Sequence, residues 1–171
     1  MIVLAFSVAL SAQASTGVLP ILNIAHVTRH RGETRETRIY LMRSHDYFVE
    51  QVDQKQSSPT PDCRQSRAVL SDQRFQSITS ITDSSEFHRL RNPSSTIDHQ
   101  DGDYWYISTK RETGTQFLAF RTEDKKTPGV VKQVIVWFEE VEKLKGLEAI
   151  HQRDEDRCSV FSDETESIWR R

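Results

Sequence analysis

Three stretches typical of β-strands follow one another early in this sequence, and only short polar breaks separate them. They lie at residues 21–27, 38–43 and 47–52, with a turn predicted at Arg31-Gly32-Glu33 and a break at Ser44-His45-Asp46. Strands joined by such short connections pair antiparallel. The pattern therefore predicts a β-meander, and a sheet of this kind needs other elements to cover an apolar face.

A helix is predicted after a short fourth strand at residues 64–69. Ser71 is its expected N-cap, and Phe75 begins a set of apolar side chains that recur every third residue. A second cap at Ser84 or Ser85 is expected to open a short helical turn.

The second half of the sequence predicts a hairpin and a longer helix. Strand patterns at residues 103–108 and 116–121 flank a turn at Thr113-Gly114. Thr127-Pro128 supplies an N-cap and a first helical residue, and Gly146 is expected to end the helix. One apolar stripe marks its buried face: Val130, Val131, Val134, Trp137, Phe138, Val141 and Leu144.

These elements predict the α+β class, with an antiparallel sheet of about four to six strands, a meander plus a hairpin, packed by two amphipathic helices. A length of 171 residues suits one domain. We divide the chain into a signal peptide at 1–14, an N-terminal strand and turn at 15–34, a single domain at 35–160 and a charged tail at 161–171.

The first residues have the features of a secretory signal peptide. An apolar run from Ile2 to Leu10 is too short to span a bilayer as a helix. Ala12-Gln13-Ala14 then matches the cleavage pattern of small residues, so we expect cleavage after Ala14. No basic residue precedes the run, and we expect the true start to lie upstream. The mature chain is therefore predicted to be periplasmic or secreted, without an integral membrane segment.

Cys63 and Cys158 are the only cysteines. An even count in an exported chain predicts a disulfide, although two free buried thiols are the alternative. A bridge between them would close most of the domain and would hold the residues around Cys158 against its body.

Composition and motifs exclude several classes of function. A net charge of −2 gives no basic field for nucleic acid, so no nucleic-acid partner is expected. The sequence contains no nucleophile elbow, zinc-protease motif, phosphate loop or CxxC pair. We therefore expect no catalytic, metal-binding or cofactor-binding residues, and we expect a monomer.

The histidines and acidic residues that resemble sites are predicted to have structural roles. His26 and His30 are four apart, which on a strand is about 13 Å and too far for one metal ion, so we expect two exposed histidines at the strand end. The spacing of Asp98, Asp101 and Asp103 does not match an EF-hand. His45-Asp46 is assigned to a turn, and the remaining candidate, His88, to a solvated helix face.

Tyr104, Trp105 and Tyr106 form the most notable surface candidate. On a strand, Tyr104 and Tyr106 share one face while Trp105 takes the other. One face must pack on the helices, so the other could offer aromatic area to a partner. Packing on both faces of the sheet is the alternative.

The order of elements from Arg35 to Lys145 resembles that of small bacterial exported domains, and it is similar to the arrangement in emfourin-like protease inhibitors. The resemblance covers about two thirds of the chain, carries over no active residue, and implies a binding role only by analogy. The residues that carry it are Leu70-Ser71, Phe75, Ile78, Phe87, Leu90, Gly114, Pro128 and Trp137-Phe138.

We therefore expect an exported, non-catalytic domain that binds another protein, with a protease as one form of partner. Two alternatives stay open. One is a small extracellular hydrolase that uses Asp98, Asp101 or a histidine, and the other is a structural component of the cell envelope.

Overall fold

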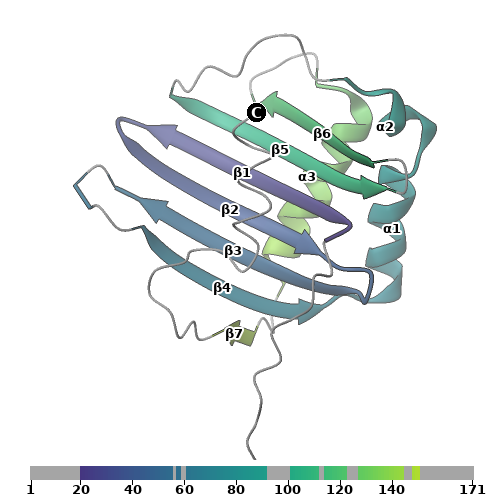
Figure 1. The fold of residues 1–171 in the computed structure, drawn as a ribbon, viewed down its shortest axis with the longest axis horizontal. Coiled ribbons are helices and arrows are strands. Elements are labelled where there is room, and N and C mark those ends of the chain that lie inside the picture. The colour runs from purple at the N-terminus through teal and green to yellow at the C-terminus, as the bar shows by residue number, and fades with distance from the viewer. Residues whose placement is uncertain are drawn as a thin grey trace, which may run out of the picture.

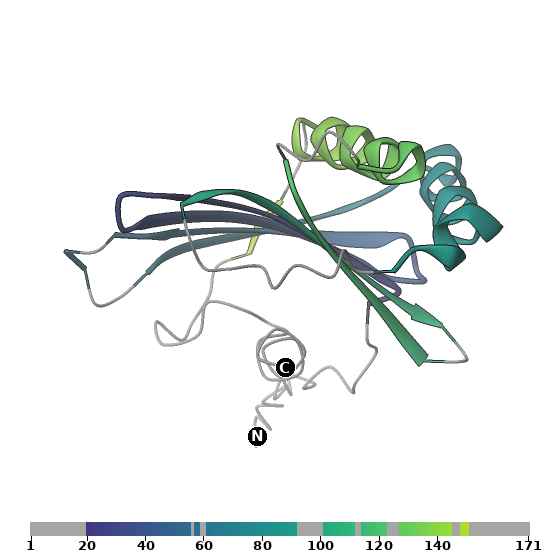
Figure 2. The same cartoon turned by 90° about the horizontal axis from the view of Figure 1, so that it is seen from above.

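The computed structural model of the chain describes residues 20–55, 57–58, 61–91, 101–111, 114–122, 127–144 and 148–150. These residues form one antiparallel sheet with helices on one of its faces, so the α+β class is confirmed (Figures 1 and 2). Six long strands fit the predicted four to six, and a three-residue strand is added at one edge. In chain order the strands are β1 (Leu22–His30), β2 (Glu33–Leu41), β3 (Asp46–Gln54), β4 (Asp62–Val69), β5 (Gly102–Arg111), β6 (Gly114–Arg121) and β7 (Glu148–Ile150).

The first four strands form the predicted meander. His30 pairs with Glu33 across a two-residue turn, in which Arg31 and Gly32 both have positive φ, at 50° and 81°. Two residues of positive φ make the turn whose twist matches a β-hairpin, and glycine adopts this conformation without a steric penalty. The predicted turn at this position is therefore confirmed.

The fifth strand returns to the opposite side of the first, which gives the sheet order β6-β5-β1-β2-β3-β4-β7. β5 pairs with β1 from Leu22↔Thr109 to Arg29↔Gly102, and with β6 as the predicted hairpin. β1 is therefore a central strand. The boundary that we placed between residues 34 and 35 falls inside β2, so the N-terminal strand and turn belong to the domain.

Two of the three helices begin at predicted caps. The Ser71 side chain accepts a hydrogen bond from the Arg74 N–H at the start of α1 (Asp72–Thr82), and Ser84 accepts one from the Phe87 N–H at α2 (Ser85–Arg89). The third helix, α3 (Gly129–Glu142), has Pro128 as its N-cap. We expected the cap at Thr127, one residue too early. Pro128 has an extended backbone, with ψ 148°, so Pro128 precedes the first helical turn and is itself the cap.

The sheet has two faces that are both partly buried. Face A carries Leu22, Ile24, His26, Thr28 and His30 of β1 and the residues paired beside them; face B carries the alternate residues, beginning with Asn23. All three helices pack on the face A side (Figure 2). There, the Phe138 ring meets the Trp105 ring edge-on at 5.1 Å. None of the helices within the described ranges is long and apolar enough to cross a membrane.

Candidate functional site

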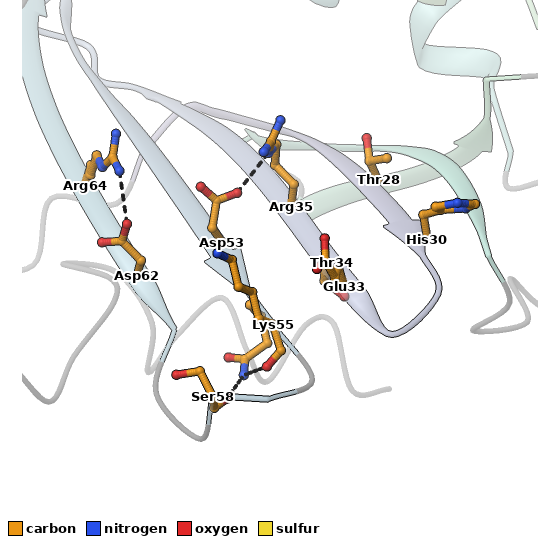
Figure 3. Close-up of a pocket in the computed structure, with 11 residues that line it drawn as sticks. Thr28, His30, Glu33, Thr34, Arg35, Asp53, Lys55, Ser58, Asp62 and Arg64 are labelled. Carbon is orange, nitrogen blue, oxygen red and sulfur yellow. Dashed lines mark hydrogen bonds and ion pairs between the residues drawn. The ribbon is translucent and has the colours of Figure 1, made fainter.

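The helices cover only one half of face A. The core on that half contains Leu22, Ile24, Ile39 and Val49, but the alternation continues along the same strands into polar residues beyond the helices. This uncovered half is an open hollow of about 670 Å³ (Figure 3). It is lined by Thr28, His30, Glu33, Thr34, Arg35, Asp53, Gln54, Lys55, Ser58, Asp62 and Arg64.

Strand register brings these side chains together from four strands. Thr28 pairs with Arg35, Arg35 pairs with Asp53, and Asp53 pairs with Asp62. Directly opposed residues of antiparallel strands point to the same face, with their Cβ atoms about 5 Å apart. Residues spread from position 28 to position 64 therefore form one continuous polar surface.

Two ion pairs lie in the hollow, one between β2 and β3 and one within β4. Arg35 Nε lies 2.9 Å from Asp53 Oδ1, and Arg64 Nη2 lies 3.0 Å from Asp62 Oδ2 (Figure 3). The arginine side chains are 78% and 72% exposed. Exposed ion pairs of this kind contribute about 0–1 kcal/mol to stability, so both can exchange partners at little cost.

His26 lies where the apolar core meets the hollow. Its ring stacks on Trp105 with centroids 4.3 Å apart and planes within 7° of parallel. Its Nε2 atom is buried and has no hydrogen-bond partner. We expected two exposed strand-end histidines, but only His30 is exposed; His26 is half-buried because β5 lies beside β1 and supplies Trp105.

His45 and His88 lie apart from the hollow, among neighbours of their own. His45 stacks on Phe75 at 3.8 Å, and its Nδ1 lies 3.1 Å from Asp72 Oδ1. His88 is exposed on α2, as expected. No cluster of three metal-ligating side chains occurs in the part of the chain that the structure describes.

The two described acids of the loop with the spacing Asp98, Asp101 and Asp103 have separate hydrogen-bond partners. Asp101 Oδ2 accepts a hydrogen bond of 3.3 Å from the Arg31 N–H, and so joins the start of β5 to the β1–β2 turn. The Asp103 carbonyl accepts one of 3.0 Å from the Thr122 N–H. Asp98 lies outside the described residues.

The aromatic triplet of β5 divides between the faces as predicted. Trp105 is 3% exposed in the face A core, and Tyr104 is 0% exposed on face B. Of the three, only Tyr106 is half-exposed. The interface role stays a prediction, and Tyr106 is the residue that has surface available for it.

Sequence reasoning missed a buried polar network on face B. Glu50 is 1% exposed, and its carboxylate accepts hydrogen bonds from the Tyr40 hydroxyl at 3.1 Å and from Gln65 Nε2 at 2.8 Å. Arg38 Nη1 lies 3.7 Å from Glu50 Oε2, and Arg38 also pairs with Glu36. Burial raises the pKa of Glu50 above its ordinary value, and these partners only partly oppose the effect. The available signal was Glu50 itself, a charge inside the apolar strand 47–52.

The predicted disulfide stays a prediction. Cys63 lies on β4 with its side chain on face B, because it pairs with Val52. Cys158 lies outside the described residues, as do the predicted signal peptide and the charged tail.

Comparison of the sequence with known proteins gives no family for this chain. No protein-family model matches the chain, and no match was found among curated proteins. The class is therefore defined by the structure alone: an α+β domain with one antiparallel sheet and a half-covered polar face.

Proposed function

We propose that this chain is an exported, non-catalytic domain that binds another protein through the hollow on face A. The observation that supports the proposal is the half-covered sheet: polar and charged side chains of four strands line an open hollow beside a packed core. The strands hold the backbone of this surface rigid, so binding would order only side chains.

The chemistry of the lining favours a protein surface over a small molecule. Pockets for small molecules are lined mainly by apolar and aromatic side chains that enclose the ligand. The lining of this hollow contains three basic side chains and three carboxylates: Arg35, Lys55, Arg64, Glu33, Asp53 and Asp62. Complementary charges of both signs orient a protein partner and fix its register.

The balance of basic and acidic side chains in the hollow also indicates which partner surface would fit it. A surface rich in one sign would meet like charges in the hollow, which costs affinity. A partner with basic and acidic groups side by side can replace Asp53 at Arg35 and Asp62 at Arg64 without leaving a charge unpaired. A protease is one such partner, in keeping with the resemblance to emfourin-like inhibitors.

A capture experiment tests the proposal. Residues 15–171, tagged at the N-terminus, would serve as bait in culture supernatant and envelope extract of the native host. The variant Arg35→Glu/Arg64→Glu reverses both exposed cations and should lose the captured protein. The control Lys132→Glu/Lys143→Glu makes the same charge change at exposed positions at α3 and should retain it.

Each outcome has a defined meaning. Capture by the wild type and the control but not by the hollow variant supports the proposal. Equal capture by all three proteins, or no specific capture under several salt conditions, contradicts it. Inhibition of a captured protease would identify the inhibitor form, whereas hydrolysis of substrates by the purified chain, lost in His30→Ala, would favour the hydrolase alternative.

A further inference from the structure

Face B is buried although the described helices all lie on face A (Figure 2). Ala25, Tyr40 and Tyr104 on this face are 0%, 1% and 0% exposed. Flanking side chains of a sheet cannot by themselves remove whole tyrosine rings from water, because a face without a second layer stays open to solvent. Another segment must therefore cover this face.

A buried polar side chain supports the same inference. Asn23 is 3% exposed on face B, and neither its Oδ1 nor its Nδ2 has a hydrogen-bond partner. A buried amide without partners loses its hydrogen bonds to water and gains none in return, so native structures rarely contain one. Backbone groups of a covering segment would satisfy both atoms.

We propose that residues 151–171 lie across face B as an intramolecular cover, fastened by a Cys63–Cys158 disulfide. This inference concerns the face opposite the hollow and does not depend on the proposed function. It identifies a second interaction surface whose partner is the chain's own C-terminal segment.

The position of β7 supports this occupant. Ile150 pairs with Gln65 at the β4 edge, two positions from Cys63, whose side chain points to face B. The chain therefore enters the C-terminal segment directly beside the cysteine that we expect it to reach. Cys158 lies eight positions after Ile150, a reach of roughly 26 Å when extended.

The length of the segment is sufficient. Five strand spacings separate β7 from β5 in the sheet order, or about 24 Å. Residues 151–171 span roughly 32 Å even if fully helical. By contrast, cleavage after Ala14 would leave only residues 15–19 before the described chain, a reach of about 17 Å.

The composition of residues 151–171 also suits a segment that packs on face B. The segment has apolar side chains at Val160, Phe161, Ile168 and Trp169, which can pack on the tyrosines of face B. Arg29 and Arg121 lie over the Tyr104 ring, with their guanidinium carbons 5.8 and 5.4 Å from its centroid. Two acidic runs, at 154–156 and at 163–166, offer carboxylates to such arginines.

Hydroxyl-radical footprinting of the oxidised chain 15–171, read by mass spectrometry, tests the cover. Tyr40 and Tyr104 report on face B, and Tyr47, 1% exposed in the face A core, is the internal control. All three should be protected in the wild type. Phe161→Asp/Trp169→Asp should raise labelling of Tyr40 and Tyr104 several-fold and leave Tyr47 unchanged.

A second variant keeps the test decisive if the first one unfolds, which labelling of Tyr47 would reveal. Cys158→Ser removes only the fastening, and it should raise labelling of Tyr40 and Tyr104 by a smaller factor. Continued protection of both tyrosines in both folded variants would overturn the proposal. Concentration-dependent protection would then point to a second copy, and loss of protection on removal of residues 15–19 to the N-terminal segment.

Discussion

His26 of β1 and Trp105 of β5 stack with their ring centroids 4.3 Å apart, although they lie 79 positions apart in the chain. The stack forms the boundary between the apolar core and the polar hollow of face A. On the core side, Phe138 of α3 meets Trp105 edge-on. These two ring contacts of Trp105 therefore join β1, the β5–β6 hairpin and α3.

We expect His26→Phe to be stable and His26→Ala to be destabilised. Phenylalanine keeps the stack and removes the buried Nε2 that has no partner, so urea unfolding should give a stability within about 0.5 kcal/mol of the wild type or above it. Alanine loses the stack, at a cost of roughly 1–2 kcal/mol. A large loss in His26→Phe would show that Nε2 has a partner in solution.

Phe138→Ala should reduce the free energy of unfolding by about 3–5 kcal/mol, because it leaves a cavity between α3 and Trp105. The matched control is Val136→Ala on the same helix, where the side chain is 54% exposed and the change should be within about 0.5 kcal/mol. Equal effects of the two substitutions in denaturant titrations would contradict the packing described for this helix.

Glu50→Gln should change how stability depends on pH. Burial raises the pKa of Glu50 above its ordinary 4.5, so the folded state holds this proton more tightly than the unfolded chain. The stabilising contribution is fully present below pH 4.5 and is lost as pH rises through the folded pKa. Urea unfolding at several pH values should show the wild type losing stability relative to Glu50→Gln across this window. A constant difference would mean that Glu50 does not titrate abnormally.

Asp46→Asn should change the pH dependence of stability in the opposite direction. The Ser44 hydroxyl at 2.6 Å, and then Arg67, lower the pKa of Asp46 below its ordinary 3.8. Its contribution is present above that value and is lost as pH falls through the folded pKa. The stability advantage of the wild type over Asp46→Asn should therefore be largest near neutral pH and shrink in acid. Ser44→Ala, which removes the first of the two partners, should reproduce part of the effect.

Removal of the predicted disulfide should destabilise the chain under oxidising conditions. Cys63→Ser and Cys158→Ser should each cost about 2–4 kcal/mol, and the double variant no more than either alone, because one substitution already breaks the bridge. A digest without reductant should contain the Cys63 and Cys158 peptides linked. Two free thiols in the oxidised wild type would show the pairing to be wrong.

Local signals in the sequence determined the elements. Ser71 and Ser84 cap their helices through contacts within three residues, and Arg31-Gly32 makes a turn that depends on its own backbone. Patterns of this range predicted the meander, the hairpin and the amphipathic helices, because each is decided by neighbours in the chain.

Only the tertiary structure decided which faces and ends of the sheet are covered. Both faces of β1 and β5 carry apolar residues, so alternation could not tell which face the helices take, or that Tyr104 and Trp105 are both buried. The hollow was missed because Thr28, Arg35, Asp53 and Asp62 each look like an ordinary solvated residue until antiparallel register places them side by side. Non-local pairing decides that arrangement, and local sequence patterns do not record which strands become neighbours.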